Sequence, residues 1–554
     1  MKKILKLTLL ITVFSLFLFG CKENEENVTV SIVEDTYDIG RTTLNFTLNV
    51  NDPNAKDDKL SVKIVAYAYE IVQGIGTEID LNLTDSYTVD ETVEEVELDG
   101  LTQETNYRLI IKKTSGEETV LLEKDFKTTN VGSKENPISI STIEEFYTIA
   151  DDMNAHYKLT ADLDFNDYVN KNDGDKNTYS YLGSSTKPFK GVLDGDGHTI
   201  KNINNFAFPS SAYYFGLFAT IEYEGVVKNL NFQNIKFSTA NAEGTLVTKS
   251  IEYIGIVAGY NEGTIENVTF DGITIEAGLS RSTSYVGVVA GVNDGTIEDV
   301  TVKNASIKLE STLTNFYVGG VCGMLGKDAE GLGKKVSKAN VNVNLNIKTQ
   351  KNSMYVGGLV GEARGDINNS YVAGKVDLRT ETTATSDFKN SLYAGGLVGK
   401  HTKGYVSTSI SNLESINISS SFAAKINVGG LVGQSGINSI TNCLTTTDIN
   451  VLFDTQEQYA YKVKENDVEV SPYVIGFTNA TIADKAVEIV KDCYVVSGTA
   501  YNIGYVTEDI TFDDVVVSEN VVNSLAKDFY KDTLGFDENI WDLENLTENM
   551  PVLK

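Results

Sequence analysis

The stretch that decides the fold is YVGGLVG, residues 355–361. Close variants of these seven residues recur on both sides of it: YFGLFA (214–219), YIGIVAG (253–259), YVGVVAG (285–291), YVGGVCG (317–323), YAGGLVG (393–399) and NVGGLVG (427–433). YVIGF (473–477) and YNIGY (501–505) look like degenerate copies of the same block. From the first block to NVGGLVG, the leading glycine returns every 32–39 residues. Self-similarity at such a period indicates a repeat architecture rather than one globular core.

A second block follows each glycine block, as in GTIENVTF and GTIEDVTV. It aligns one apolar column: Val227, Ile265, Ile297, Val336, Ile367, Val406, Ile440 and Val490. A column of smaller residues runs beside it: Leu230, Val268, Val300, Ala339, Ser370, Ser409, Cys443 and Cys493. Between the two lies a column rich in Asn, which is typical of a structural turn: Asn229, Asn267, Asp299, Asn369, Asn442 and Asp492. A third, more polar strand is expected after each second block.

One unit of this length cannot bury both faces of its apolar strands, whereas stacked units can. We therefore expect successive units to pile up as parallel strands, with like residues forming ladders inside the stack. The paired glycines fit places where a strand bends close to the interior, because a Cβ atom would obstruct it. Differences in unit length should fall in loops on the outside, since the ladders cannot absorb a shift in register.

These blocks resemble the GLUG motif of bacterial surface proteins, named for its Gly-rich core. The segment before them strengthens the resemblance, because HYKLTADLDF and PFKGVLDGDGHTI resemble the lead-in of GLUG arrays. The resemblance covers about three quarters of the chain and implies a right-handed parallel β-helix, in agreement with the general crossover preference. It divides this part into a lead-in and N-terminal cap (130–213), GLUG-type repeats (214–505) and a C-terminal cap (506–554).

Short helices are expected to cap the two ends of the solenoid, whose strand edges would otherwise be exposed. Ser141 to Glu144 fits a capping box, and Ile143, Phe146, Ile149 and Ala150 then fall on one helical face. At the far end, residues 523–533 indicate a short amphipathic helix. Trp541, the single tryptophan, is expected in the core of the C-terminal cap.

Residues 28–129 predict a small β-sandwich, because short alternating runs are separated by turn residues. Leu101 to Tyr107 resembles the tyrosine corner of a fibronectin type III domain. The tryptophan usual in that family on an early strand is absent, and Phe46 is a candidate for its place.

The first 20 residues predict a lipoprotein signal peptide. Three lysines precede the apolar run 7–19, which is too short to span a membrane, and Gly20-Cys21 follows at once. Leu18 to Cys21 resembles a bacterial lipobox, which implies that Cys21 carries the lipid; an ordinary leader that ends in Cys is the alternative. Residues 21–27 then form the lipidated cysteine and a charged tether, which resembles the outer-leaflet export signal of Bacteroidota lipoproteins. The prediction is a protein anchored in the outer membrane and facing the exterior.

Charge and composition narrow the function further. The net charge of −31 repels phosphate backbones, so nucleic-acid binding is not expected. Abundant Gly, Tyr and Phe with only 6 Pro and 4 Cys describe a β-rich chain that is not a disulfide scaffold. We expect a monomer whose only membrane contact is the lipid anchor.

The sequence offers little catalytic or metal chemistry. The three histidines, His156, His198 and His401, form no H-E-x-x-H pair; the first two belong to the lead-in and His401 is expected in a variable turn. Asn170 to Asp175 resembles a calcium loop but lacks the distal Glu, so a solvated polar loop is preferred. We expect no enzyme, cofactor or metal site.

The cysteines also have structural interpretations. Cys443 and Cys493 share a ladder column. In adjacent coils, either a disulfide or two stacked buried thiols would fit, and the thiols are preferred. Cys322 takes a Val-like core position.

The function expected from the sequence is adhesin-like binding of a host protein or a glycan through the solenoid. A structural component of a cell-envelope assembly is the alternative, and a polysaccharide-degrading enzyme is less favoured because carboxylates are spread over the turns. Binding predicts exposed aromatic residues on one face, with Tyr and Phe of the third strands or long loops as candidates.

Overall fold

The computed structural model describes residues 29–554 apart from a set of gaps. The longest gaps are residues 52–59, 170–176, 207–212, 382–390, 454–472, 479–489 and 504–524. The predicted signal peptide, Cys21, the tether and the calcium-like loop lie outside the described residues. The chain divides into two compact units, Met1–Val131 and Gly132–Lys554, which are described separately below.

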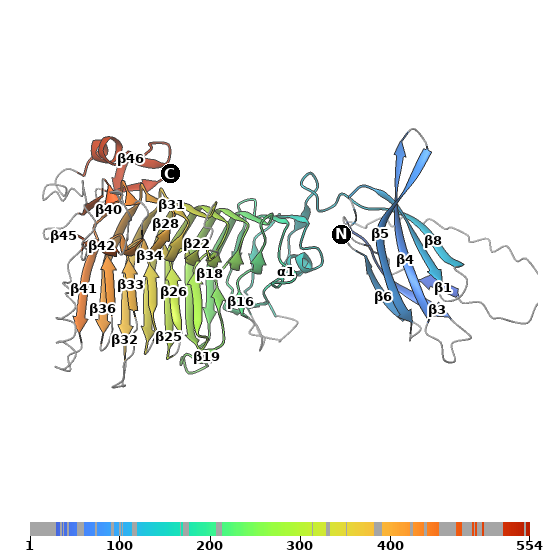
Figure 1. The fold of residues 1–554 in the computed structure, drawn as a ribbon, viewed down its shortest axis with the longest axis horizontal. Helices are drawn as coiled ribbons and strands as arrows, with labels where there is room; N and C mark the ends of the chain where they lie inside the picture. Colours follow the sequence, from blue (N-terminus) through green and yellow to red (C-terminus); the bar gives the residue numbers. More distant parts are fainter. Residues whose placement is uncertain are drawn as a thin grey trace, which may run out of the picture. The chain divides into compact units, whose positions relative to one another are not determined.

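The first unit contains two antiparallel sheets (Figure 1). In one, β3 (Leu44–Asn51) pairs with β1 (Thr29–Ile32), β2 (Asp38–Ile39) and β6 (Val93–Leu98). The other has the order β5 (Ile75–Val89), β4 (Leu60–Val72), β7 (Asn106–Lys113) and β8 (Thr119–Lys127). Every second residue of β3 is buried, and these residues form one core with alternate residues of β7: Leu44, Phe46, Leu48, Val50, Tyr107, Leu109 and Ile111. The predicted sandwich is confirmed.

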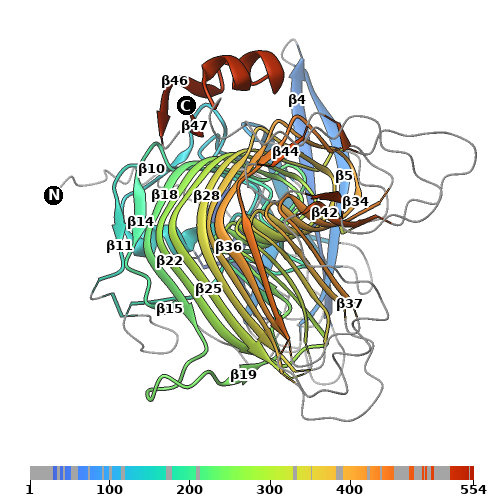
Figure 2. The same ribbon diagram turned by 90° about the vertical axis from the view of Figure 1, so that its left-hand side faces the viewer.

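The second unit is a parallel β-solenoid, and the fold class predicted from the repeats is confirmed (Figures 1 and 2). Its first sheet is built from the YVG halves of the glycine blocks: β16 (Tyr214–Phe215), β20 (Tyr253–Ile254), β23 (Thr283–Gly287), β26 (Asn315–Gly319), β29 (Met354–Gly357), β33 (Ser391–Gly395) and β37 (Lys425–Gly429). Its second sheet is built from the residues after the bend: β17 (Phe218–Ile221), β21 (Ala258–Asn261), β24 (Ala290–Asn293), β27 (Cys322–Leu325), β30 (Val360–Arg364), β34 (Val398–Lys403), β38 (Val432–Ser435), β42 (Tyr473–Thr478) and β45 (Tyr501–Ile503).

The third sheet holds the long strands that close each coil. In stacking order these are β9 (Ile138–Ile140), β10 (His156–Leu159), β13 (Val192–Asp194), β18 (Val226–Ser238), β22 (Thr264–Leu279), β25 (Thr296–Ser311), β28 (Lys335–Thr349), β32 (Tyr371–Thr380), β36 (Ile410–Ser420) and β41 (Asp448–Phe453). Shorter pieces continue its rows: β11 (Leu163–Asp164), β14 (Thr199–Lys201), β19 (Thr248–Lys249), β31 (Asp366–Asn368), β35 (Val406–Ser407), β39 (Ile440–Thr441), β40 (Leu444–Thr445), β43 (Val490–Lys491) and β44 (Tyr494–Val495). In the lead-in, β12 (Thr178–Tyr179) pairs with β15 (Asn205–Phe206).

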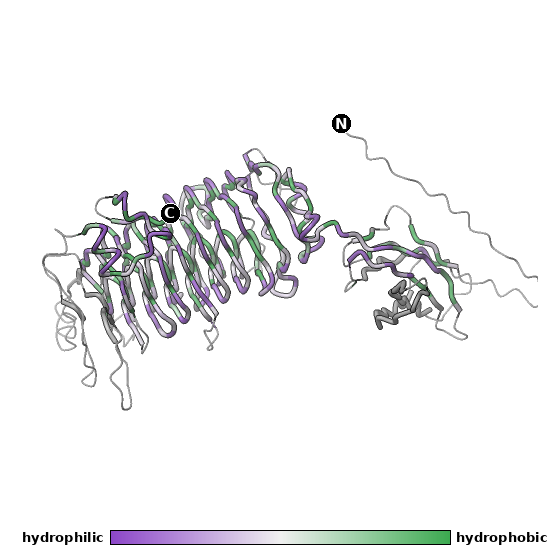
Figure 3. The backbone as a smooth tube through the Cα atoms, turned by 90° about the horizontal axis from the view of Figure 1, so that it is seen from above, coloured by the Kyte–Doolittle hydropathy of each residue, from purple (hydrophilic) through white to green (hydrophobic). Residues whose placement is uncertain are grey.

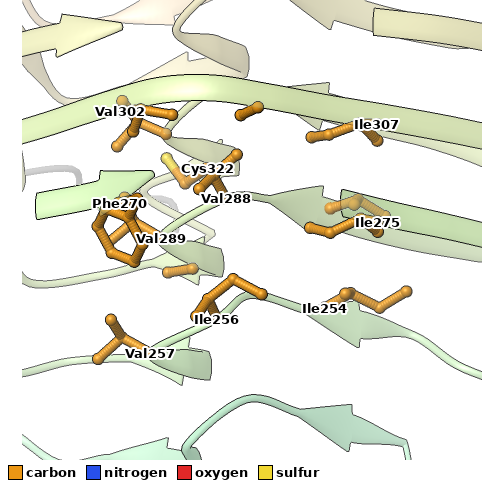
Figure 4. Packing of buried hydrophobic residues seen from close by; sticks show 14 of the residues in the cluster. Ile254, Ile256, Val257, Phe270, Ile275, Val288, Val289, Val302, Ile307 and Cys322 are labelled. Atoms are coloured by element: carbon orange, nitrogen blue, oxygen red, sulfur yellow. The ribbon is translucent and has the colours of Figure 1, made fainter. Parts of the chain in front are cut away.

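The predicted apolar column is confirmed in register. Val227 pairs with Ile265 and Ile265 with Ile297, and the pairing continues coil by coil to Val490. All members whose burial is described, Val227 to Ile440, are fully buried. Figure 4 shows the same arrangement elsewhere in the core, where like side chains of successive coils lie above one another. The coils alternate polar and apolar residues along their length (Figure 3).

The glycine pairs lie where the first sheet bends into the second. A Cβ atom on Gly358 would lie 2.8 Å from a methyl group of Val372 and against the backbone oxygen of Gly396 in the next coil. The predicted need for residues without Cβ is therefore met at this bend. YVIGF stacks on the second half of the preceding glycine block: Ile475 pairs with Val432, so Gly476 takes the place of Gly433 in the second sheet.

The second and third blocks of a unit form one long strand in four consecutive coils, β18, β22, β25 and β28, rather than the separate strands expected; in the later coils they are separate pieces. β22 runs through 16 residues and bends at Asn267, which has a φ of +52°. The other described members of the Asn-rich column share this left-handed conformation: Asn229, Asp299, Asn369 and Asn442. Asn and Asp tolerate it best among residues with a side chain, so the column is structural, as predicted.

The N-terminal cap differs slightly from the expectation. α1 spans Ile143–Tyr147 and continues into a 3-10 turn, η2 (Thr148–Ala150), which buries Ile143, Phe146 and Ile149. The capping box is formed by Thr142 and Glu145 rather than by Ser141 and Glu144. The backbone nitrogen of Glu145 donates to the Thr142 hydroxyl, and the backbone nitrogen of Thr142 donates to the Glu145 carboxylate.

The C-terminal segment, residues 525–554, contains a π-helical turn, η4 (Phe529–Thr533), and a hairpin of β46 (Trp541–Thr547) and β47 (Met550–Leu553). It lies on the outside of the coils (Figures 1 and 2) and covers an outward column: Tyr371, Ile410, Leu444 and Tyr494. The same column is polar in preceding coils: Asn231, Thr269, Thr301 and Asn340. Trp541 is fully buried in this cluster, as predicted. The described residues of the C-terminal segment therefore cover the side of the solenoid.

No helix among the described residues combines the length and apolar character needed to cross a bilayer.

Candidate functional site: the tyrosine ladder

The first sheet carries a row of tyrosines on its outer side, which we call the tyrosine ladder: Tyr214, Tyr253, Tyr285, Tyr317, Tyr355 and Tyr393. Each precedes a residue that points into the core, such as Val356 after Tyr355, so it must point outward. In-register stacking then places the rings face to face, with centroids 4.3–5.4 Å apart and planes within 28° of parallel. The ladder follows directly from the repeat.

The second sheet supplies a facing column: Tyr260, Val292, Met324, Glu362, Lys400 and Gln434. Although Val292 and Met324 point outward, they are only 0% and 3% exposed, because Tyr253 and its neighbours in the ladder cover them. The glycine that follows the bend lets the two columns approach: a Cβ atom on Gly361 would lie 2.6 Å from the backbone nitrogen of Val318.

Because the rings stack on one another, their faces are occupied and the ladder presents ring edges and hydroxyl groups. Burial raises the pKa of Tyr253, Tyr317 and Tyr355, and it raises the pKa of Tyr285 to about 12. These phenols therefore stay protonated at any physiological pH and can donate hydrogen bonds.

Charged residues occupy the start of the ladder. The Lys327 ammonium lies 4.6 Å from the centroid of Tyr253 and 3.8 Å from a carboxylate oxygen of Glu252. Glu252 also pairs with Arg281 at 2.9 Å. Lys327 lies at the start of the loop between β27 and β28, which is longer than the loop between β24 and β25; residues 328–332 of it lie outside the described residues.

A buried carboxylate, Asp294, holds this loop to the ladder. It accepts hydrogen bonds from the Tyr260 hydroxyl and from the backbone nitrogen of Lys327, and it lies 3.4 Å from the Lys334 ammonium at the other end of the loop. At this place the charges are paired with one another.

The other end of the ladder carries a cation of a different kind. The Lys400 ammonium lies 5.6 Å and 5.7 Å from the ring centroids of Tyr355 and Tyr393, within cation–π range. No carboxylate among the described residues lies within ion-pair distance of it. Glu362, its neighbour in the column, bonds instead to Arg364 at 3.0 Å and to the Thr402 hydroxyl at 3.1 Å.

The histidines are apart from the ladder and from one another. His156 lies in β10, and His198 faces Asp162 at 3.4 Å in the lead-in. His401 was expected in a turn, but it lies in β34, where its ring is buried and contacts the Ser435 hydroxyl and the Gly404 carbonyl. Burial lowers the pKa of His401 to about 4.

The three described cysteines, Cys322, Cys443 and Cys493, are buried free thiols. Ile440 pairs with Val490 and Leu444 with Tyr494, so Cys443 and Cys493 stack in adjacent coils. The preferred interpretation, stacked thiols, is confirmed. Cys322 lies between Ala290 and Val360 in the core, and burial raises its pKa. No group of three or more His, Cys, Asp or Glu suited to a metal ion occurs in the part of the chain that the structure describes.

Sequence reasoning expected the aromatic face in the third strands or loops, whereas the ladder lies in the glycine blocks themselves. The signal was present: a tyrosine heads nearly every block. The outward direction of these tyrosines could have been inferred, because a residue next to an inward valine in a strand must point outward.

Comparisons with known proteins place one tyrosine of the ladder, Tyr355, within a known motif. Residues 352–377 match the GLUG motif, a match that includes Tyr355 and the bend after it. A stretch of 150 residues, 26% of this chain, is 31% identical to halomucin of Haloquadratum walsbyi, and it spans 2% of that protein. Among solved structures, the sensor domain of the anti-sigma factor RsgI4 of Pseudobacteroides cellulosolvens matches over 19% of this chain and 76% of that domain, with 11% identity and a TM-score of 0.14. The chain is thus similar to GLUG-containing repeat proteins.

Proposed function

We propose that this protein is a non-enzymatic, lipid-anchored surface protein that binds a host protein or a glycan through its solenoid, as an adhesin does. The tyrosine ladder is the observation that carries the proposal. It is a regular face of largely buried, protonated phenol groups with cations beside it, on a scaffold held rigid by its stacked core. Tyrosines of this kind supply large amphipathic contact area at low entropic cost.

The surface location rests on two lines of support. The GLUG match and the similarity to halomucin favour a surface-associated repeat protein. The sequence of residues 1–27 favours lipidation at Cys21 and an outer-membrane anchor.

The first unit is proposed as a fibronectin type III-like spacer. Its sheets have the strand orders β1-β3-β6 and β5-β4-β7-β8, which resemble those of that family. Tyr107, expected at the tyrosine corner, is buried and stacks on Phe126 at 5.4 Å.

The alternative role, a component of a cell-envelope assembly, predicts a long uncharged stripe on the solenoid. Instead, lysines and carboxylates cross the outer face of the third sheet, as in the pairs Lys236–Glu276, Lys335–Glu298 and Lys375–Asp377. The described part of the third sheet therefore does not supply such a stripe. The tyrosine ladder is itself an uncharged row on the first sheet, so the binding screen decides between the two roles.

The test is a screen of residues 28–554 on arrays of glycans and host-matrix proteins, beside the variant Tyr317→Ala. Tyr317 lies in the middle of the ladder, so its removal should weaken binding while the coil stays folded. The control is Tyr405→Ala, which removes an exposed tyrosine from a turn outside the ladder. Binding that is lost equally in both variants, or no binding to any array, would overturn the proposal.

A further inference from the structure

From the donors at its far end, we infer that the tyrosine ladder binds the acidic group of a glycan, a carboxylate or sulfate, at Lys400 and Tyr393. The inference rests on the proposed function and names the ligand class for that same face.

The first observation is an excess of donors. Lys400 is partly buried and has no ion-pair partner among the described residues. The Tyr393 hydroxyl, whose ring lies within cation–π range of Lys400, makes no hydrogen bond to any residue that the structure describes. An ammonium and the ring of a phenol donor thus lie 5.7 Å apart, and neither has an acceptor or anion among the described residues.

The second observation lies one coil further on. Asn427 takes the ladder position after Tyr393 and is only 5% exposed. Its amide nitrogen, Nδ2, is buried and finds no acceptor among the described residues. This amide adds positive partial charge beneath the surface, and no acceptor offsets it.

The carboxylates nearby do not neutralise this end. Glu362 precedes Lys400 in its column, but its Oε1 already accepts bonds from Arg364 and Thr402. The start of the ladder is different, since Lys327 there is paired with Glu252. Both ends of the ladder thus carry a lysine over stacked tyrosine rings. Among the described residues, the lysine without a carboxylate partner is Lys400.

The cation at Lys400 favours an anionic ligand, and the row of tyrosine hydroxyls favours a glycan. The phenol hydroxyls repeat once per coil, about every 4.8 Å along the stack. That regular row of ring edges and donors suits a hydroxyl-rich chain lying along the solenoid axis. Its acidic group would lie at Lys400 and Tyr393, and neutral sugar units would contact the ladder tyrosines of the preceding coils.

The experiment measures binding of residues 28–554 to matched pairs of glycans that differ only in the acidic group. Sialyllactose is compared with lactose, polygalacturonate with its methyl ester, and chondroitin sulfate with chondroitin. The sialyl and uronate pairs test a carboxylate and the third pair tests a sulfate. We expect the acidic member of at least one pair to bind at least about tenfold more tightly, as expected for a charge-assisted hydrogen bond.

Variants separate this site from others on the chain. Lys400→Gln should remove the preference for the acidic member, and Tyr393→Phe, which keeps the ring stack, should weaken it. Lys375→Gln is the matched control, because it removes one lysine charge from the third sheet. Circular dichroism and melting curves establish that each variant is folded.

Three outcomes would overturn the inference. They are equal binding of acidic and neutral members, a preference that survives Lys400→Gln, and binding confined to acidic peptides placed on the same array. In each case the proposed function stands, because a ligand is still bound. Only the absence of any binding on the glycan and matrix arrays would also remove the proposed function.

Discussion

Thr408→Asn should stabilise the solenoid locally. Thr408 has a φ of +50° and occupies the place that Asn369 and Asn442 fill in the neighbouring coils. Left-handed backbone costs a residue with a side chain about 1–2 kcal/mol, and a β-branched residue is the poorest choice there. Asn relieves part of this cost, and its amide can join the column in the way that Asn267 bonds to Asn229 at 2.7 Å. We expect a gain of about 1 kcal/mol.

Because coils are coupled mainly to their neighbours, the gain should be local rather than spread over the chain. Hydrogen exchange read by mass spectrometry on peptides from 398–420 should show about fivefold slower exchange, the factor that corresponds to 1 kcal/mol. The reverse change, Asn369→Thr, should speed exchange in its own coil by a similar factor. Ser407→Asn is the control, since Ser407 has no left-handed φ.

The result that refutes this reasoning is a stabilisation by Ser407→Asn as large as that by Thr408→Asn. It would mean that the added amide, rather than relief of the backbone, is responsible. Lys338→Asn gives a further check. Lys338 also has a left-handed φ, but its ammonium pairs with Glu298 at 3.1 Å, so the gain there should be smaller.

Four other predictions test separate parts of the structure. Gly358→Ala should destabilise its coil by about 3 kcal/mol, seen in urea unfolding, because the methyl group meets backbone of the next coil. Trp541→Ala should release the C-terminal segment to limited proteolysis while the coils stay protected, with a cost of about 3–5 kcal/mol to that cluster. The pKa of His401 in the folded protein, about 4, lies below its unfolded value. The contribution of this residue to stability is therefore complete above pH 6.5 and is lost as pH falls toward 4. In His401→Gln, the urea midpoint should depend less on pH across this range. Cys443 and Cys493 should react with a thiol reagent only in denaturant, and reaction of the native protein would contradict their burial.

The stacking could be predicted from sequence because it depends on periodicity alone. Ile265, Ile297 and Ile367 align in the sequence at the same offset from their glycine blocks, and a parallel stack has one register that buries all three. The left-handed column was also readable, since Asn recurs at the bend between two apolar columns.

The lateral position of the C-terminal segment could not be predicted in this way. The only sign is a change in one outward column from Asn340 to Tyr371 and then Ile410, and nothing in the periodicity says what covers it. The register of YVIGF could not be predicted for a related reason. Its glycine suits either bend, and pairing of Ile475 with Val432 depends on contacts with the coil below.

The far end of the ladder lay beyond sequence reasoning altogether. Lys400 differs from the residues at its register position in other coils, but its separation from Glu362 depends on the bonds that Glu362 makes to Arg364 and Thr402. Which partner a side chain bonds to depends on the three-dimensional structure and does not appear as a periodic pattern in the sequence.

Disulfide trapping between outward positions of neighbouring coils tests the in-register stack most directly. Cysteines at Thr269 and Thr301, which are paired in register, should bond on mild oxidation, because parallel neighbours lie within disulfide reach. Cysteines at Thr269 and Asn340, two coils apart, should not bond. If the second pair formed a disulfide and the first did not, the coils could not be stacked as described.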